Sequence, residues 1–205
     1  LMEHPDTDLS SIRAFLCGGS AVPRGLIDWF WQNHDIKIVQ GWGMTETNPI
    51  ASVALLKPEM ETDWTWDQQL DVLESAGRPV MGLKVKIVDE TGEDLPHDGE
   101  AFGELRIRGP WIAAEYINDP RSPESFVDGW LRTGDVSKIT PDGYIRITDR
   151  AKDVIKSGGE WISSLDLENA LMAHPAVAEA TVVGLKHEKW QERPAAFVVA
   201  RPGTD

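Results

Sequence analysis

The chain has one cysteine, no long apolar run and fewer basic than acidic residues. With Cys17 alone, neither an internal disulfide nor a cysteine-rich zinc site can form, and such scarcity is typical of the reducing cytosol. Apolar stretches such as 50–56 and 195–200 have the length of core strands, far below the roughly 20 residues of a membrane span. We therefore expect a cytoplasmic protein without a membrane span.

Basic side chains are fewer than acidic ones: the 205 residues contain 20 Lys and Arg and 34 Asp and Glu, which gives a formal charge of −14. A general nucleic-acid surface gains affinity by neutralising phosphates, so this balance argues against nucleic acid as a partner. It leaves room for a small anionic ligand, because charges are screened over about 8 Å at physiological salt and the local lining of a pocket decides. The oligomeric state is not fixed by the sequence.

The first 74 residues combine strand and helix patterns. Apolar, β-branched runs at 12–17 and 36–39 predict buried strands, and Pro23 suits the first turn of a helix between them. Burial in a core explains the aromatic face of that helix better than a ligand site does; the face comprises Leu26, Ile27, Phe30, Trp31 and His34. From 57 to 74 the periodicity fades, which predicts a long surface loop or a lid. Its Trp64 and Trp66 fit packing onto the domain better than contact with a substrate.

After Gly77 the sequence pattern changes to short strands of alternating apolar and polar residues around 83–87, 105–107 and 138–148. This pattern predicts a compact antiparallel sheet or barrel. Farther on, Ser163 and Asp166 suit the start of a helix, and strands at 177–184 and 195–200 follow it. The buried stripe expected on this helix is Leu167, Ala170, Leu171 and His174. The chain therefore predicts a mixture of α/β and α+β architecture.

The stretch 41–47, GWGMTET, combines an aromatic ring, a hydroxyl and a carboxylate with two glycines. Gly41 and Gly43 would let the Trp42 indole lie flat against a planar ligand, which gains roughly 1–3 kcal/mol when a base stacks on it. Thr45 and Glu46 are a pair suited to a phosphate and its Mg²⁺. The alternative is a strand, a glycine turn and a buried tryptophan, and this stretch alone does not decide between them.

A second candidate is WLRTGD, 130–135, a loop with a glycine that aims a carboxylate. Asp135 would accept both hydroxyls of a ribose, and each hydrogen bond to a charged acceptor is worth about 1.5–3 kcal/mol. The alternative is an aspartate that closes a turn before a strand, which is common.

A third candidate is 149–162, DRAKDVIKSGGEWI, where cations lie close to a flexible Ser157, Gly158 and Gly159 loop. Positive charge beside a glycine loop is typical of a site that receives phosphates or a long thiol cofactor. A solvated linker between domains is the alternative, and one segment can serve both purposes. The cations counted are Arg146, shortly before this segment, and Arg150, Lys152 and Lys156 within it.

Taken together, five segments resemble the adenylate-forming enzymes, the superfamily of acyl-CoA synthetases, nonribosomal peptide adenylation domains and firefly luciferase. They occur in the family's order and spacing over nearly the whole chain: GGSAVP (18–23), GWGMTET (41–47), GELRIRGP (103–110), WLRTGD (130–135) and DRAKDVIKSGGEWI (149–162). The sequences of segments 41–47 and 149–162 most resemble those of the fatty-acyl-CoA synthetases. The resemblance implies an AMP-forming ligase that activates a carboxylic acid, such as a medium- or long-chain fatty acid, with ATP and Mg²⁺ and passes it to coenzyme A.

The resemblance also implies roles for residues around the nucleotide. Gly18, Gly19 and Ser20 would border adenine and the acyl group, and the 41–44 stretch, with Trp42 stacked on adenine, would include Met44. Thr45 would touch the α-phosphate, and Glu46 would hold Mg²⁺. Asp135 and Arg150 would grip the ribose, with Ile147 packed nearby.

Three domain assignments follow from the same resemblance. Residues 1–74 would be the C-terminal part of a large α/β domain, 75–149 a β-barrel subdomain, and 150–205 the start of a mobile α+β domain. Lys152 would be the hinge for rotation between two half-reactions. Lys156 and the loop of Ser157, Gly158, Gly159, Glu160 and Trp161 would face the active site during thioester formation.

The family's lysine-bearing phosphate loop and its C-terminal catalytic lysine have no counterpart in these residues. Leu1 precedes the first methionine and no signal-peptide pattern follows, so we expect a partial chain that makes no adenylate alone. Asp149, where many members have glycine, is a smaller departure. Two alternatives stay open: an enzyme that adenylates another acid or loads a carrier protein, and a non-catalytic nucleotide-binding relative.

Overall fold

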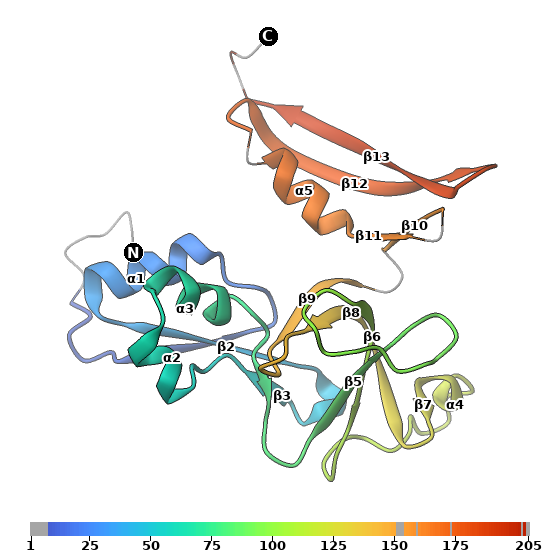
Figure 1. Cartoon of the computed structure of the whole chain (residues 1–205), viewed down its shortest axis with the longest axis horizontal. Helices are drawn as coiled ribbons and strands as arrows, with labels where there is room; N and C mark the ends of the chain where they lie inside the picture. Colours follow the sequence, from blue (N-terminus) through green and yellow to red (C-terminus); the bar gives the residue numbers. More distant parts are fainter. Residues whose placement is uncertain (1–7, 151–153, 159, 173, 202, 204–205) are drawn as a thin grey trace.

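A computed structural model describes residues 8–150, 154–158, 160–172, 174–201 and 203. These residues form three sheets that follow one another in sequence, and Figure 1 shows them as three units. We call them the first unit (β1–β4 with α1–α3), the second unit (β5–β9) and the third unit (β10–β13 with α5). The mixture of α/β and α+β architecture predicted from the sequence is confirmed.

The first unit contains a four-stranded sheet in the order β1-β2-β3-β4. Only β1 and β2 run parallel, and the helices α1 and α3 pack on β2. Its core joins α1, β2 and α3 through Ile27, Phe30, Ile36, Ile38 and Leu70. The elements are β1 (Ala14–Gly18), α1 (Arg24–His34), β2 (Lys37–Gly43), η1 (Thr45–Thr47), β3 (Ile50–Val53), α2 (Pro58–Asp63), α3 (Trp66–Leu73) and β4 (Arg78–Pro79).

The prediction of a long loop or lid at 57–74 is wrong, because two short helices occupy it. Pro58 begins α2, and Thr65 caps α3 by accepting a hydrogen bond from the Gln68 backbone N–H. The Trp66 ring stacks on Trp31 at 5.5 Å between centroids, so it packs onto the unit as expected. The periodicity was hard to see because each helix spans only about two turns.

The second unit is an antiparallel sheet in the order β5-β6-β8-β7, with β9 also paired to the long β8. The 138–148 hairpin forms as predicted, from Lys138 opposite Arg146 and Ile139 opposite Ile145. Trp42 of β2 packs against both apolar clusters of this sheet, which joins the first unit to the second. The elements are β5 (Lys84–Val88), β6 (Phe102–Arg108), α4 (Ser122–Ser125), β7 (Phe126–Val127), β8 (Trp130–Ile139) and β9 (Ile145–Arg150).

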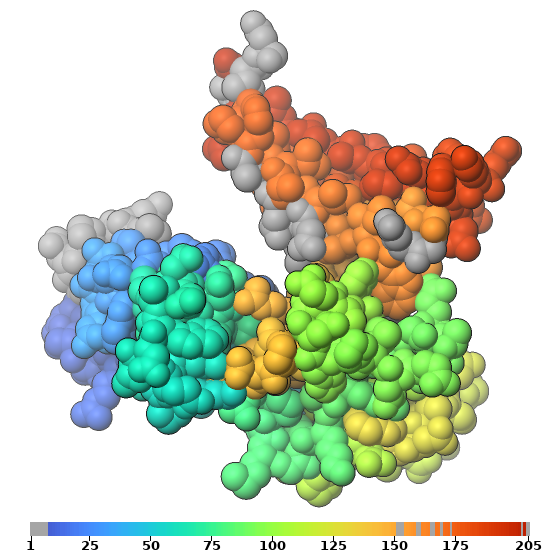
Figure 2. Space-filling view, viewed as in Figure 1, coloured from blue at the N-terminus to red at the C-terminus, as the bar shows by residue number. Residues whose placement is uncertain are grey.

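The third unit has the strand order β11-β10-β13-β12, with α5 packed against β12. Figure 2 shows it standing over the rest of the chain, and its β12–β13 hairpin extends away in Figure 1. None of the helices in the described residues is long and apolar enough to span a membrane. The elements are β10 (Ile155–Ser157), β11 (Glu160–Ile162), α5 (Ser164–Met172), β12 (Val177–His187) and β13 (Gln191–Ala200).

The start of α5 has a contact that the sequence did not predict. Asp149 of β9 accepts hydrogen bonds at its Oδ2 from the backbone N–H and the hydroxyl of Ser164, both at 2.8 Å. Ser163 also donates to the Thr148 carbonyl at 2.9 Å. The expected apolar stripe is partly wrong, because Ala170 and His174 are exposed. A carboxylate from another element can cap a helix, and sequence spacing does not reveal it.

Candidate functional site

The carboxyl ends of β1 and β2 place two of the predicted glycine segments side by side. Gly18 lies opposite Gly41 in the parallel register, and a Cβ on Gly18 would sit 3.0 Å from the Gly41 carbonyl oxygen. Gly19 follows with a φ of +90°, and Ser20 is exposed beyond it. Ligands of open α/β sheets bind at such carboxyl ends, so this edge is a candidate for one wall of a site.

The second unit brings a carboxylate to the same place. The Trp42 indole N–H donates to Asp135 Oδ2 at 3.1 Å, and Arg150 Nη1 donates to Asp135 Oδ1 at 2.5 Å. Asp135 and Arg150 are cross-strand partners in β8 and β9. Three residues that are far apart in sequence therefore meet within hydrogen-bonding distance, as one nucleotide site requires.

Burial and hydrogen bonding shift the pKa of Asp135 in opposite directions. Its side chain is only 7% exposed, and burial raises the pKa of the carboxyl, while Arg150 and the Trp42 N–H act to lower the pKa. Thr133 supports the backbone, because its hydroxyl accepts from the Asp135 N–H at 3.1 Å. A carboxylate has about four lone-pair positions, so Asp135 keeps capacity for further donors such as hydroxyl groups.

The indole of Trp42 is both a packed core residue and part of this site. It contacts the cluster of Ile87, Leu105, Ile139 and Ile145, against which Ile147 also packs. The alternative of a buried tryptophan is thus partly right, since the ring is half-buried. Stacking of adenine on this ring stays a prediction.

The turn after β2 presents Thr45 and Glu46. Thr47 braces it by accepting from the Met44 N–H at 2.9 Å and donating to the Pro49 carbonyl at 2.5 Å. A Cβ on Gly43 would lie 1.8 Å from the Pro49 carbonyl oxygen, so this position requires glycine for packing. Met44 packs against the second unit, whereas the neighbouring Thr45 is exposed.

Glu46 has a partner that sequence reasoning missed. Tyr116, in the segment between β6 and α4, donates its hydroxyl to Glu46 Oε1 at 2.5 Å. This hydrogen bond, together with burial, raises the pKa of Tyr116 to about 12, so the phenol stays a donor at neutral pH. No periodic pattern or local spacing signals a contact between residues 70 positions apart.

The donor set at Glu46 fits a weakly held Mg²⁺ and no closed metal cage. Groups of three or more His, Cys, Asp or Glu that could hold a metal are absent from the described residues. Mg²⁺ is usually bound through one or two carboxylates together with substrate phosphates and waters. One carboxylate beside an exposed threonine hydroxyl matches that arrangement.

The predicted residues of the third unit lie apart from this cluster. Lys156 Nζ forms an ion pair with Glu90 at 2.7 Å, and the Trp161 indole N–H donates to the same carboxylate at 3.0 Å. The hydrogen bonds from Lys156 and Trp161, together with the charge of Lys156, lower the pKa of Glu90. Across the described part of the chain, no hydrogen bond or ion pair joins Lys156 or Trp161 to Trp42, Asp135 or Glu46.

The glycine loop of the third unit is shaped by packing. Ser157 is buried and pairs with Glu160 in the β10–β11 hairpin. Gly158 has a φ of +65°, and a Cβ there would lie 2.7 Å from the Trp190 ring. The expectations for Lys152 and Gly159 lie outside the described residues. Arg146, counted among the candidate cations, instead donates to the Asp71 carbonyl at 2.9 Å and so joins the second unit to α3.

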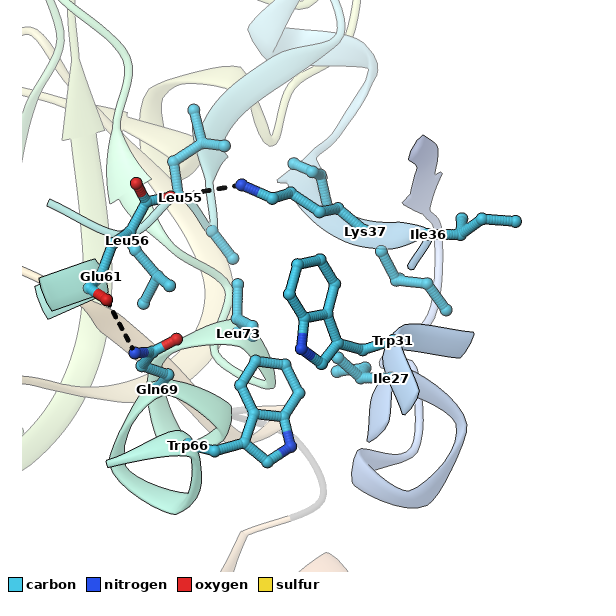
Figure 3. A pocket seen from close by; sticks show the side chains of 13 residues that line it. Ile27, Trp31, Ile36, Lys37, Leu55, Leu56, Glu61, Trp66, Gln69 and Leu73 are labelled. Atoms are coloured by element: carbon cyan, nitrogen blue, oxygen red, sulfur yellow. Dashed lines mark hydrogen bonds and ion pairs between the residues drawn. The ribbon is translucent and has the colours of Figure 1, made fainter. Parts of the chain in front are cut away.

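Two hollows differ in their relation to the candidate site. A cleft of about 620 Å³ lies between β9 and the third unit and is lined by Ile147 and Arg150. An apolar pocket of about 200 Å³, shown in Figure 3, lies between the start of β2 and the helices, where Trp31 and Trp66 face each other. This second pocket is at the opposite end of β2 from Gly41, so it takes no part in the cluster described above.

Comparison with known proteins identifies the family of the chain. Residues 1–117 match the family model of the AMP-binding enzymes, and residues 166–205 match the model of the AMP-binding enzyme C-terminal domain. The chain belongs to the AMP-binding enzymes. The resemblance to adenylate-forming enzymes that the five sequence segments carry is thereby confirmed.

Relatives of this chain include acid–CoA ligases. A 3-methylmercaptopropionyl-CoA ligase of Ruegeria lacuscaerulensis is 43% identical over 97% of this chain and 36% of its own length. A long-chain-fatty-acid–CoA ligase of Thermus thermophilus is 44% identical over 94% of this chain and 36% of its own length. The chain thus spans about 36% of the length of these curated relatives.

Solved structures show the same likeness. The o-succinylbenzoate CoA synthetase of Bacillus subtilis, in complex with its acyl-adenylate intermediate, superposes with a TM-score of 0.79 at 32% identity over 100% of this chain and 40% of that one. The same enzyme in complex with ATP and a magnesium ion gives a TM-score of 0.78 at 31% identity, with the same coverage.

Proposed function

We propose that this chain is part of an AMP-forming acyl-CoA synthetase. In the first half-reaction, a carboxylate oxygen of the acid attacks the α-phosphorus of ATP, the bond to the β-phosphate breaks, and pyrophosphate leaves. In the second, the sulfur of coenzyme A attacks the acyl carbon and AMP leaves, while the thiol proton passes to solvent. The observation that supports the proposal most directly is the contact of Trp42 and Arg150 with one buried carboxylate, Asp135.

In this proposal the cluster of Trp42, Asp135 and Arg150 binds the adenosine part of the nucleotide. Purine stacking on an aromatic ring contributes roughly 1–3 kcal/mol, and the two ribose hydroxyls donate to the remaining lone pairs of Asp135. Arg150 fixes that carboxylate from the other side. The edge at Gly18, Gly19, Ser20 and Gly41 borders adenine and the acyl group.

Thr45 and Glu46 serve the phosphates. The exposed Thr45 hydroxyl donates to the α-phosphate, and Glu46 supplies one carboxylate oxygen to the metal. When bound, Mg²⁺ neutralises charge that develops on the phosphates during attack. Because the Glu46 carboxylate is already oriented by Tyr116, little reorganisation is needed when substrate arrives.

The second half-reaction is assigned to the third unit. We propose that it turns about Lys152, as a domain that begins near residue 150, so that Lys156 and the 157–161 loop reach the thioester-forming site in place of their contacts with Glu90. Residues 1–74 and 75–149 would be the end of the large domain and its β subdomain. We retain the cytoplasm as the expected location.

The acid is proposed to be a medium- or long-chain fatty acid. Support comes from the Thermus thermophilus relative and from a medium-chain-fatty-acid–CoA ligase of Ectopseudomonas oleovorans, 42% identical over 95% of this chain. A short sulfur-bearing acid is the second candidate, because the relative at 43% identity is a 3-methylmercaptopropionyl-CoA ligase.

The test uses the protein at its full natural length with ATP, Mg²⁺ and octanoate, palmitate or 3-methylmercaptopropionate. We expect acid-dependent ATP–pyrophosphate exchange without coenzyme A and rapid AMP release once it is added. Release of AMP with a carrier protein or another acid alone would reject the fatty-acid assignment, and no exchange with any acid would reject the ligase. The 205 residues alone, which contain no lysine-bearing phosphate loop, are expected to show no exchange.

A further inference from the structure

The hydroxyl of Tyr116 donates to Glu46 Oε1 at 2.5 Å, and this contact joins the second unit to the turn after β2. No other side chain in the described residues donates a hydrogen bond to this carboxylate. Oε2 therefore keeps its lone pairs for another ligand. The inference drawn from this contact rests on the proposed function, in which Glu46 faces the metal and the phosphates.

The position of Tyr116 is itself fixed by the second unit. Its backbone N–H donates to the hydroxyl of Ser122 at 2.7 Å, and Ser122 is buried. Its ring packs edge-on against Phe126 of β7, with centroids 5.2 Å apart and an interplanar angle of 65°. The phenol thus reaches Glu46 from a rigid base, so it can orient the carboxylate rather than follow it.

Two further hydrogen bonds hold the segment before Tyr116 against the turn that carries Glu46. The Ala113 N–H donates to the Glu46 carbonyl at 2.9 Å, and the Asn48 side-chain amide donates to the Trp111 carbonyl at 2.6 Å. The 111–116 segment therefore clamps the short helix η1 through its backbone as well as through Tyr116. Loss of the phenol alone would leave the turn in place and free only the carboxylate.

We propose that Tyr116 is a positioning residue for Glu46. It engages one carboxylate oxygen and holds the other toward the metal that accompanies the nucleotide phosphates. A freely rotating glutamate loses side-chain entropy when it binds a cation, and a hydrogen-bonded one has lost much of it already. Partners that orient a metal ligand in this way typically change metal affinity by about 10–100-fold when they are removed.

The test is Tyr116→Phe in the full-length protein, with Mn²⁺ as the probe of the metal site. Electron paramagnetic resonance measures the dissociation constant of Mn²⁺ in the presence of ATP, and calorimetry measures the dissociation constant of AMP without metal. We expect Mn²⁺ affinity to fall about 10-fold while AMP affinity and the melting temperature change little. In turnover assays, the Mg²⁺ concentration for half-maximal rate should rise by a similar factor.

Tyr144→Phe is a matched control, because Tyr116 and Tyr144 are the two tyrosines of the chain. The Tyr144 hydroxyl also makes a single strong contact to an oxygen, the Leu55 carbonyl at 2.8 Å, but it lies in a separate core cluster. This variant should keep the Mn²⁺ affinity of the wild type. Glu46→Gln supplies the reference for complete loss of the metal ligand.

The outcomes separate the inference from the proposed function. Wild-type Mn²⁺ affinity in Tyr116→Phe, together with lost affinity in Glu46→Gln, overturns the positioning role alone. Equal losses of Mn²⁺ and AMP affinity, or a loss matched by Tyr144→Phe, show a merely structural role and also overturn it. If Tyr116→Phe weakens only Mn²⁺ binding but the wild type activates no acid, the inference holds and the ligase proposal fails.

Discussion

The residues expected around the nucleotide and those expected to serve coenzyme A are held in different ways. Asp135 is 7% exposed at its side chain and receives hydrogen bonds from two other elements, whereas Lys156 and Glu90 are 44% and 56% exposed in their ion pair. Buried, multiply bonded groups are expensive to rearrange, and exposed ion pairs exchange readily. The difference suits a fixed nucleotide site served by a third unit that changes its contacts.

Removal of the buried carboxylate should have the largest effect. Asp135→Ala takes away the acceptor for both ribose hydroxyls, each worth about 1.5–3 kcal/mol, so AMP affinity of the full-length protein should fall about 100-fold or more. Calorimetric titration measures this. Asp142→Ala is the control, because that exposed carboxylate pairs with Lys57 at the β8–β9 turn. An AMP affinity within twofold of the wild type would place the ribose elsewhere.

Asp135→Asn sharpens the comparison by separating stability from binding. Since burial raises the pKa of Asp135, the folded state holds this proton more tightly than the unfolded state, and the stability contribution of the carboxyl falls as the pH rises through its folded pKa. Asparagine does not ionise, so its burial does not become less favourable as the pH rises. Arg150, 54% exposed, stays solvated without its charged partner. We expect AMP affinity to drop about 10-fold.

The stability part of this prediction is measured as the melting temperature at pH 4 and at pH 7. The wild type should lose stability relative to Asp135→Asn between these values, so that the variant melts at the same temperature or higher at pH 7. If the melting temperature of the wild type instead rises relative to that of the variant over the same pH range, the effects of Arg150 and Trp42 on the Asp135 carboxyl outweigh that of burial.

A smaller effect is expected where β9 meets the third unit. Asp149→Ala removes the acceptor of the Ser164 N–H at the start of α5, which costs about 1 kcal/mol, and should speed hydrogen exchange of the first α5 amides about fivefold. The exposed Glu179→Ala on β12 is the control. AMP affinity should not change in the Glu179→Ala control. Unchanged exchange in Asp149→Ala would mean that Ser164 finds an equivalent partner.

The smallest effect is expected at the exposed ion pair. A double-mutant cycle of Glu90→Ala and Lys156→Ala on thermal stability should give a coupling of at most about 1 kcal/mol at low salt, and less at 1 M salt. Glu93→Ala, in the same turn, is the control. A salt-resistant coupling of several kcal/mol would mean that the third unit is locked to the second, against the proposed rotation.

The sequence predicted what depends on local pattern and missed what depends on contacts between distant segments. The α1 helix follows from Pro23 and its apolar face, and the meeting of Trp42 with Asp135 follows from the family motifs. Tyr116 and Glu90 carry no motif, because their roles arise only when separate segments fold together. The helices at 58–73 were missed because two-turn helices show little periodicity.

A structure of the full-length protein with AMP bound tests the central claim most directly. We predict both ribose hydroxyls about 3 Å from the carboxylate oxygens of Asp135 and the purine lying against the Trp42 ring. AMP bound at another place, with Asp135 still engaged only by Trp42 and Arg150, would contradict the account.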